Sequence, residues 1–227
     1  EGPGLFSKIA AQKGFRCEIY KLSKGDHLPI PRKEDLILIM GGPMGVRDIN
    51  NKTYYWLKKE VQFITEAIEN KFPIIGVCLG AQLLAHIMGG KIVKLKNKTN
   101  NKYKPEIGWS EISSIKCSYN NNLSLFLKRP LNVLHWHSDR IILPKKSHLI
   151  ASSDYCREQL FILGKKLYGL QFHAETEGLM TNNWINKDKN FIIDALGEKG
   201  QTILKDECNK YELSSLKRRL LFIDKLI

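Results

Sequence analysis

Residues 74–82 read Ile-Ile-Gly-Val-Cys-Leu-Gly-Ala-Gln, and the fold can be predicted from this stretch. An apolar run ends in a turn of small residues with Cys78 at its apex, and residues 83–88 continue as an apolar helix. Strand, turn and helix in this order are the layout of a nucleophile elbow. The glycines permit a strained backbone and leave room around the sulfur, while the start of a helix favours the thiolate. The stretch therefore predicts that Cys78 attacks a carbonyl group.

Strand and helix patterns alternate on the N-terminal side of this stretch. Apolar runs at residues 35–40 and 73–77 suit buried parallel strands, and residues 15–21 alternate like a further strand. Residues 3–14 and 54–70 carry apolar side chains at helical spacing. This alternation predicts an α/β fold with a doubly wound sheet.

Short strands are expected from Gly90 onward, and they predict a mixed or antiparallel extension of the sheet. The runs lie at residues 91–95, 109–115, 133–136, 149–152, 159–163 and 167–172. We expect one domain over residues 1–227, with a core of about 1–185 and a helical tail from about 186 to 227. The tail is expected to cover the core, with Lys217, Arg218 and Arg219 forming one basic face of its helix.

A histidine and a glutamate stand two positions apart in Leu-Gln-Phe-His-Ala-Glu at residues 170–175. Side chains two positions apart on an extended segment point to the same side. Glu175 can therefore orient the imidazole of His173, which can take the thiol proton of Cys78. A single cysteine or histidine is more often a packing residue, so the prediction of a nucleophile, base and orienting acid rests on the two patterns together.

These motifs resemble those of the triad, or class I, glutamine amidotransferases. The elbow at residues 76–82 and Gln-Phe-His-Ala-Glu at 171–175 carry the resemblance. Gly-Gly-Pro-Met-Gly at 41–45 resembles the family's oxyanion strand, and His-Trp-His-Ser-Asp at 135–139 resembles its glutamine-pocket loop. Pro-Glu-Ile-Gly-Trp at 105–109 is similar to stand-alone members related to the amidotransferase domain of GMP synthase. The resemblance implies a flavodoxin-like, open, mostly parallel sheet with the mixed extension.

The resemblance also implies roles for residues outside the triad. The backbone N–H groups of Gly42 and Leu79 match the two oxyanion donors. The amino-acid part of glutamine would be gripped by Gln82, Met44, Ser138 and Asp139. The chain has Ala174 where the family often has proline, and Gly-Pro-Met-Gly where many members have Gly-Pro-Gly.

The function implied by the resemblance is that of a glutaminase-type amidotransferase, which releases ammonia from glutamine through a γ-glutamyl thioester. The ammonia would pass to an acceptor on a separate synthetase, because this sequence contains neither an ATP-pyrophosphatase domain nor a P-loop. Two alternatives stay open. One is a hydrolase acting on other γ-glutamyl compounds, such as γ-glutamyl peptides, with the same triad. The other is a regulatory homologue that has the fold without turnover.

Composition sets further bounds on function. The apolar runs are too short to span a bilayer, and five cysteines without C-x-x-C or zinc spacing suit a reducing compartment. We therefore expect a cytoplasmic protein with no membrane association, no catalytic metal and no cofactor. The net charge of +13 is scattered and accompanies no nucleic-acid motif, so we expect no nucleic-acid partner. Because a helix near Glu1 would normally follow a strand, about ten further native residues are expected before it.

Overall fold

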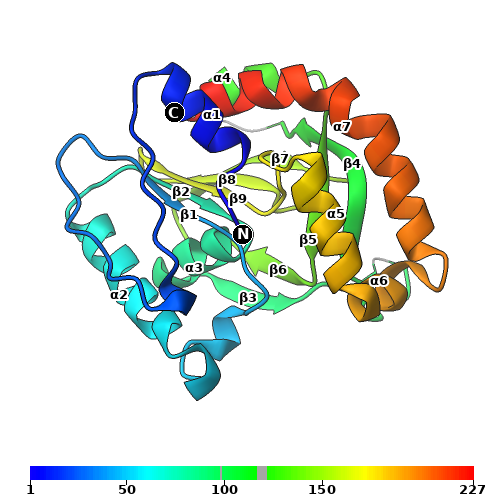
Figure 1. Ribbon diagram of the computed structural model, residues 1–227, viewed down its shortest axis with the longest axis horizontal. Coiled ribbons are helices and arrows are strands. Elements are labelled where there is room, and N and C mark those ends of the chain that lie inside the picture. The colour runs from blue at the N-terminus through cyan, green and yellow to red at the C-terminus, as the bar shows by residue number, and fades with distance from the viewer. Residues whose placement is uncertain (98, 117–121) are drawn as a thin grey trace.

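The computed structural model describes residues 1–97, 99–116 and 122–227 (Figure 1). Its centre is a seven-stranded sheet with helices on both faces. In spatial order the strands are β1 (Ile37–Ile39), β2 (Ile74–Val77), β9 (Leu167–Leu170), β8 (Leu160–Leu163), β7 (Ser147–Ser152), β4 (Glu106–Ser114) and β5 (Leu131–His137).

The three strands at one edge of this sheet are parallel. β1 pairs with β2, and β2 pairs with β9. The strands β8, β7, β4 and β5 each run antiparallel to their neighbours. These pairs confirm the predicted α/β fold with its antiparallel extension. Among the described strands only β1, β2 and β9 are parallel, so the large sheet is mixed and not mostly parallel as the resemblance implies. The short connections between β7, β8 and β9 account for this, because tight turns can join only antiparallel strands.

The strand predicted at residues 15–21 is wrong. These residues are exposed and form no regular secondary structure. Their apolar side chains include Phe15 and Ile19, which are 43% and 55% exposed. Among the described residues, β1 is paired with β2 on one side only. Residues 15–21 do not pair with the free side of β1 or with any other described strand, so they lack the backbone hydrogen bonds that a strand needs.

A second, two-stranded sheet lies beside the first. β6 (Asp139–Ile142) pairs antiparallel with β3 (Lys91–Lys94), and Lys94 stands opposite Asp139. The sequence pattern predicted β3 but not β6, whose four residues follow β5 after a single residue, Ser138. This pairing fixes the loop between β5 and β6.

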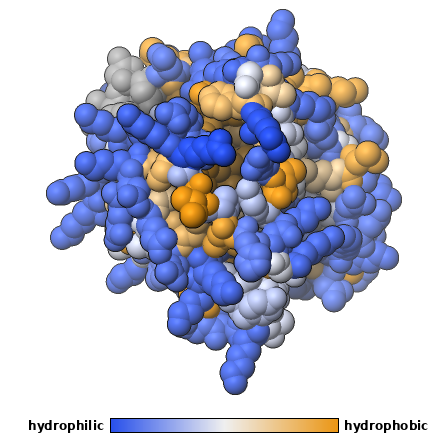
Figure 2. All heavy atoms as spheres, turned by 60° about the vertical axis from the view of Figure 1, so that its left-hand side comes forward, coloured by the Kyte–Doolittle hydropathy of each residue, from blue (hydrophilic) through white to orange (hydrophobic). Residues whose placement is uncertain are grey.

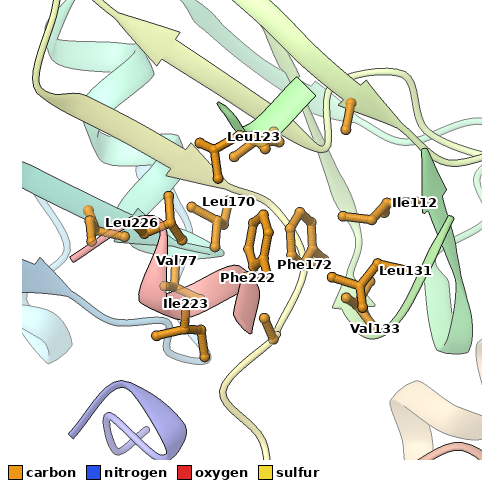
Figure 3. Packing of buried hydrophobic residues seen from close by; sticks show 14 of the residues in the cluster. Val77, Ile112, Leu123, Leu131, Val133, Leu170, Phe172, Phe222, Ile223 and Leu226 are labelled. Atoms are coloured by element: carbon orange, nitrogen blue, oxygen red, sulfur yellow. The ribbon is translucent and has the colours of Figure 1, made fainter. Parts of the chain in front are cut away.

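One face of the large sheet is covered by α1 (Leu5–Gln12) and α7 (Gly200–Asp224). Between them and the strands lies a buried apolar cluster, in which the rings of Phe172 and Phe222 have centroids 5.8 Å apart (Figure 3). Burying a side chain of this size stabilises the folded state by about 1.5–3 kcal/mol. The C-terminal helix is therefore part of the core that supports the strands.

The opposite face is covered by α2 (Trp56–Glu69) and α3 (Leu79–Ile87). α2 buries Leu57, Ile64 and Ala67 on one side, at helical spacing. In α3, all residues from Leu79 to Ala85 are buried, so this helix has no solvated side along most of its length. The elbow helix is thus fixed by packing on all sides.

The chain ends in three helices: α5 (Gly178–Lys187), α6 (Lys189–Leu196) and α7. They enclose a third apolar cluster around Trp109 and Trp136. In Figure 1, α7 runs along the top and right of the molecule, and it contacts α1, α5, α6, β4 and β5. α5 was not predicted. In the part of the chain that the structure describes, no helix has the length and apolarity needed to cross a membrane.

Hydrophilic side chains dominate the face shown in Figure 2, where they surround a hollow that is partly lined by hydrophobic residues. This agrees with a sequence in which 36 Lys and Arg residues outnumber 23 Asp and Glu residues. Surface charge of one sign keeps proteins apart in solution, but it does not define a fold.

Candidate active site

Cys78 occupies a strained position between β2 and α3. Its backbone angles are φ 51° and ψ −105°, outside the regions that residues other than glycine normally adopt. Such a conformation costs about 1–3 kcal/mol and persists only where the surroundings enforce it. Here the Cys78 N–H donates to the Leu170 carbonyl at 2.7 Å, and the Cys78 carbonyl accepts from the Gln82 N–H at 3.0 Å. The elbow predicted from the sequence is therefore present.

Two glycines allow strand and helix to meet at this elbow. A Cβ atom on Gly76 would lie 2.5 Å from the carbonyl carbon and oxygen of Gly80. A Cβ atom on Gly80 would lie 2.1 Å from the carbonyl oxygen of Ile39, in β1. Any other residue at either position would push α3 away from the sheet. The Gly-x-Cys-x-Gly pattern is thus explained by backbone-to-backbone packing.

His173 and Glu175 lie just beyond the end of β9, at the same edge of the sheet. The Nδ1 atom of His173 is 2.7 Å from Oε1 of Glu175, and both residues are fully buried. Burial alone would lower the pKa of His173, but the charges of Glu175 and Glu1 and the hydrogen bonds of the imidazole together outweigh this and hold the pKa well above its usual range. Backbone hydrogen bonds in both directions, at 2.8 and 3.1 Å, tie His173 to Leu134 of β5. The imidazole is therefore held from two sides.

The imidazole of His173 lies next to the Cys78 thiol. Burial raises the pKa of this thiol, while the contact with His173 acts in the opposite direction. The Nε2 atom of His173 is buried and makes no well-aligned hydrogen bond with any described residue, as is common for catalytic groups before substrate binds. Two segments that are far apart in the sequence, one with Cys78 and one with His173 and Glu175, thus lie side by side.

Two further groups contact the sulfur of Cys78. The thiol is 3.9 Å from the carbonyl oxygen of Trp136, and the Gln171 side-chain amide donates to the sulfur at 3.7 Å. Gln171 in turn accepts a hydrogen bond from Gln82 at 3.3 Å. The predicted role of Gln82 was substrate binding, but its buried amide faces Gln171 in this structure. Gln171 is the first residue of the motif at residues 171–175. The sequence predicts no role for it, because nothing in the pattern indicates where its side chain points.

The two predicted oxyanion donors come from neighbouring segments. Leu79 is the first residue of α3, so its N–H group is one of those that a helix leaves without an internal partner. A Cβ atom on Gly42 would lie 3.2 Å from Met44 and 3.8 Å from the Leu79 side chain. Gly42, Met44 and Leu79 are therefore adjacent to one another beside the elbow.

The loop that holds Ser138 and Asp139 is fixed by cations. The Lys94 ammonium lies 3.0 Å from the Asp139 carboxylate and donates to the Ser138 hydroxyl at 3.3 Å. Arg47 approaches the same carboxylate at 3.5 Å. Asp139 is only 6% exposed. Both predicted pocket residues are thus positioned, and the Asp139 side chain already has two partners.

Glu1 is a neighbour of the triad that the sequence did not reveal. Its carboxylate packs against Gly41, and one of its oxygens lies within 4.8 Å of ligand atoms of His173 and Glu175. Burial of this carboxylate raises the pKa of Glu1, and His173 opposes the shift. No motif surrounds Glu1, so only the fold could show that it lies here. A metal held by these three residues would occupy the imidazole that the triad needs as a base.

A second buried group of possible metal ligands lies on β4 and β5. Glu106 stands opposite His137, and His135 lies on the same side of β5. The Glu106 carboxylate is 3.0 Å from Nε2 of His137 and 3.6 Å from Nδ1 of His135. It also accepts hydrogen bonds from Ser153 at 2.6 Å and Gln159 at 2.8 Å. Ser153 and Gln159 thus each donate to one carboxylate oxygen, while both ring nitrogens of His135 and Nε2 of His137 make no well-aligned hydrogen bond with any described residue.

Because of this buried group, the folded state loses stability at low pH. Burial would raise the pKa of Glu106, but His135 and His137 outweigh it and lower the pKa to about 2, from an ordinary 4.5. Burial also lowers the pKa of His135 to about 4, from 6.5. As the pH falls from 4.5 towards 2, Glu106 binds a proton in the unfolded state but not in the folded state. The free energy of unfolding therefore falls by about 3 kcal/mol. Between pH 6.5 and 4, His135 contributes a loss of the same sign.

Urea unfolding at a series of pH values between 7 and 3 measures this effect. We expect Glu106→Gln to depend less steeply on pH below about 4.5 than the wild type does. Glu111→Gln, at an exposed position of the same strand, is the matched control and should keep the wild-type slope. Equal slopes in Glu106→Gln and the wild type would contradict the lowered pKa.

The chain resembles known proteins over most of its length. A sequence model of the family described as glutamine amidotransferase class-I matches residues 7–190. YfeJ of Salmonella typhimurium, described as glutamine amidotransferase-like, is 27% identical over 88% of this chain and 81% of its own length. A GMP synthase of Streptococcus pyogenes is 34% identical over 87% of this chain and 33% of its own length. The chain therefore spans about a third of this synthase.

Solved structures show the same fold. The crystal structure of a glutamine amidotransferase from Thermotoga maritima superposes with a TM-score of 0.78 and 27% identity, over 99% of this chain and 94% of that one. A structure from Methylobacillus flagellatus has a TM-score of 0.79 at 23% identity, over 100% of this chain and 88% of that one. The residues matched by the family model end within α6, so α7 lies beyond them.

Proposed function

The chain belongs to the class I glutamine amidotransferase family, and we propose that it hydrolyses the side-chain amide of glutamine with Cys78 as the nucleophile. The observation that carries the proposal is the buried pair of His173 and Glu175, joined at 2.7 Å, next to a cysteine on a strained elbow. A cysteine beside an oriented imidazole is the arrangement that activates a thiol for attack on a carbonyl. A protein without catalytic activity would have no need for the strained backbone of Cys78 or for the buried pair of His173 and Glu175.

The proposed first half-reaction forms a thioester. His173 takes the thiol proton at Nε2, since Nδ1 is engaged by Glu175. The sulfur of Cys78 then bonds to the side-chain carbonyl carbon of glutamine, and the carbonyl oxygen becomes an oxyanion. When the carbon–nitrogen bond breaks, His173 passes its proton to the departing nitrogen, which leaves as ammonia. A γ-glutamyl thioester remains on Cys78.

The second half-reaction restores the enzyme. A water molecule gives a proton to His173 and bonds to the thioester carbonyl carbon. The carbon–sulfur bond breaks, the sulfur recovers the proton from His173, and glutamate leaves. In both halves the N–H groups of Gly42 and Leu79 are proposed to stabilise the oxyanion. Removing one such donor typically costs about 2.7–4 kcal/mol of barrier.

We infer that the ammonia is used by a separate synthetase. The match covers only 36% and 33% of the lengths of two GMP synthases, so those proteins contain a large part that has no counterpart in the residues compared. Ser138, Asp139, Met44 and Gln82 are proposed to hold the amino-acid part of glutamine. A substrate would have to displace the Gln82–Gln171 contact, or compete with Lys94 for Asp139.

A substrate panel tests the proposal. Purified protein is supplied with glutamine, asparagine, a γ-glutamyl dipeptide or glutathione, and ammonia and free amino acids are measured. We expect ammonia from glutamine at a rate about tenfold or more above that from asparagine, which is one methylene shorter. Release of amino acid from γ-glutamyl peptides without ammonia from glutamine would replace the proposal with a γ-glutamyl hydrolase. Failure of every substrate, and of a glutamine-like chloroketone to label Cys78, would leave a non-catalytic homologue.

A further inference from the structure

Arg219 is a buried cation on the C-terminal helix. The sequence suggested that Lys217, Arg218 and Arg219 form one basic, solvated face, but this is wrong for Arg219. Its side chain is fully buried, and it is the largest of the fully buried side chains. The guanidinium lies over the ring of Trp109, 5.0 Å from its centroid. A buried arginine on a helix that the family model does not reach calls for a physical explanation.

The guanidinium of Arg219 donates two hydrogen bonds to the segment that carries Glu175. Its Nη1 atom donates to the carbonyl oxygens of Ala174 at 3.0 Å and Thr176 at 2.6 Å. Nε donates to the Ser215 hydroxyl at 3.0 Å, and Nη2 donates to the Glu212 carbonyl at 2.9 Å. One half of the planar group is thus anchored on its own helix, and the other half grips the segment next to the triad.

The carbonyl between those two is held as well. The Leu5 N–H, at the start of α1, donates to the Glu175 carbonyl oxygen at 2.9 Å. A Cβ atom on Gly4 would lie 2.1 Å from the same oxygen, so the N-terminal turn packs directly on it. Three successive carbonyls, at residues 174, 175 and 176, therefore accept hydrogen bonds from α1 and α7. This leaves the backbone of Glu175 very little freedom to rotate.

The charge of Arg219 also suits this place. No carboxylate of the described residues forms a direct ion pair with Arg219, and its nearest negative charges are those of Glu212, Glu175 and Glu177. Burial lowers the pKa of Arg219 to about 10, so the group stays cationic at neutral pH. A buried charge is tolerated only where hydrogen bonds and opposite charge compensate for lost water. Four hydrogen bonds and the neighbouring Glu175 provide that compensation.

We propose that Arg219 is a positioning residue that clamps the Ala174–Thr176 segment, so that the Glu175 carboxylate meets Nδ1 of His173. The inference rests on the proposed function, because it assigns a catalytic purpose to the geometry of Glu175. A displacement of about 1 Å at a catalytic group can cost about 100-fold in rate. The C-terminal helix thereby acts on the chemical step although none of its residues is placed against substrate.

Two matched variants test the clamp. Arg219→Gln is expected to lower kcat for glutamine by about 10- to 100-fold while KM changes by less than about threefold, because the segment that moves carries the triad and not the pocket loop. Arg218→Gln is the control. This neighbouring arginine donates to the carbonyls of Arg129 and Pro130 and does not touch residues 174–176. It should retain the wild-type kcat and KM.

A milder variant keeps the test valid if Arg219→Gln folds poorly. Ser215→Ala removes only the hydroxyl that holds Nε of Arg219, and alanine is the better helix former. We expect it to fold and to lower kcat by about two- to fivefold with KM unchanged. The inference would be overturned if Ser215→Ala left kcat unchanged and Arg219→Gln raised KM by the same factor as it lowered kcat.

Amide hydrogen exchange provides a readout that needs no substrate. In Arg219→Gln, exchange of a peptide covering residues 173–178 should rise about tenfold or more, while a peptide covering α3 keeps its wild-type protection. Unchanged protection at 173–178 would refute the clamp whatever the activity. If Arg219→Gln loses protection there but the wild type proves inactive on every substrate, the proposed function is refuted and the clamp stands.

Discussion

Cys78→Ala is expected to abolish ammonia release from glutamine, with kcat reduced by about 10⁴-fold to 10⁶-fold. In the proposed mechanism Cys78 forms the covalent bond, and His173, which is held by Glu175 through Nδ1, acts as the base. Residual activity would come only from polarisation of the amide by the oxyanion donors. The ammonia assay measures the loss, and mass spectrometry of the intact protein after a glutamine-like chloroketone reports the missing covalent adduct.

Cys156→Ala is the matched control for this experiment. Cys156 is also a buried free cysteine, but burial and the charge of Glu106 raise its pKa to about 12, so it is no nucleophile at neutral pH. The variant should keep the wild-type kcat and still form the adduct. A Cys78→Ala protein within about tenfold of the wild-type rate would show that the chemistry takes place elsewhere.

Gly80→Ala is expected to have the largest effect on folding. The added methyl group would lie 2.1 Å from the carbonyl oxygen of Ile39 and 2.8 Å from its carbonyl carbon, and backbone atoms cannot rotate out of the way as side chains can. Either α3 or β1 must shift, and overpacking of this kind costs about 3 kcal/mol or more. For a protein of this size, the melting temperature should fall by about 6–12 °C. Calorimetry or thermal circular dichroism measures the shift.

Gly45→Ala separates this clash from the general cost of replacing glycine. Gly45 has φ −122°, which any residue can adopt, and the nearest atom to an added methyl group is 3.6 Å away, on Arg47. Its melting temperature should stay within about 2 °C of the wild type. If the two variants were equally stable, close packing of the elbow against β1 would not be what requires glycine at position 80.

The elbow could be predicted from the sequence because its determinants are local. An apolar run, small residues around Cys78 and a helical pattern after it all lie within a short stretch, and the fold places them as expected. The resemblance to the class I glutamine amidotransferases is confirmed by the family model. His173 and Glu175 could be paired in advance because side chains two positions apart share a side of an extended segment.

Features that depend on distant partners could not be predicted in this way. The alternating residues 15–21 look like a strand, but a strand exists only where a neighbour offers hydrogen bonds. Four-residue β6 gives too short a pattern to recognise, and its existence depends on β3. Arg219 looked like one more solvated basic residue, since the carbonyls that hold it lie more than forty positions earlier. Sequence spacing contains no record of such contacts.

The roles assigned to the residues around the triad stay predictions. Gly42, Leu79 and Met44 are adjacent beside the elbow, as the resemblance implies. Gln82 and Asp139 already have partners within the protein, and the sequence could not reveal them, because both partners are set by packing between strands.

The burial of the three catalytic side chains has a kinetic consequence. His173 and Glu175 have no exposed surface and Cys78 is only 7% exposed, so Cys78 is the one residue of the three with any contact with solvent. In the proposed mechanism, ammonia must leave before water can approach the acylated sulfur. Free ammonia in the medium would then compete with water and rebuild glutamine. Turnover should therefore slow as ammonium salts accumulate, and isotopically labelled ammonium should appear in the recovered glutamine.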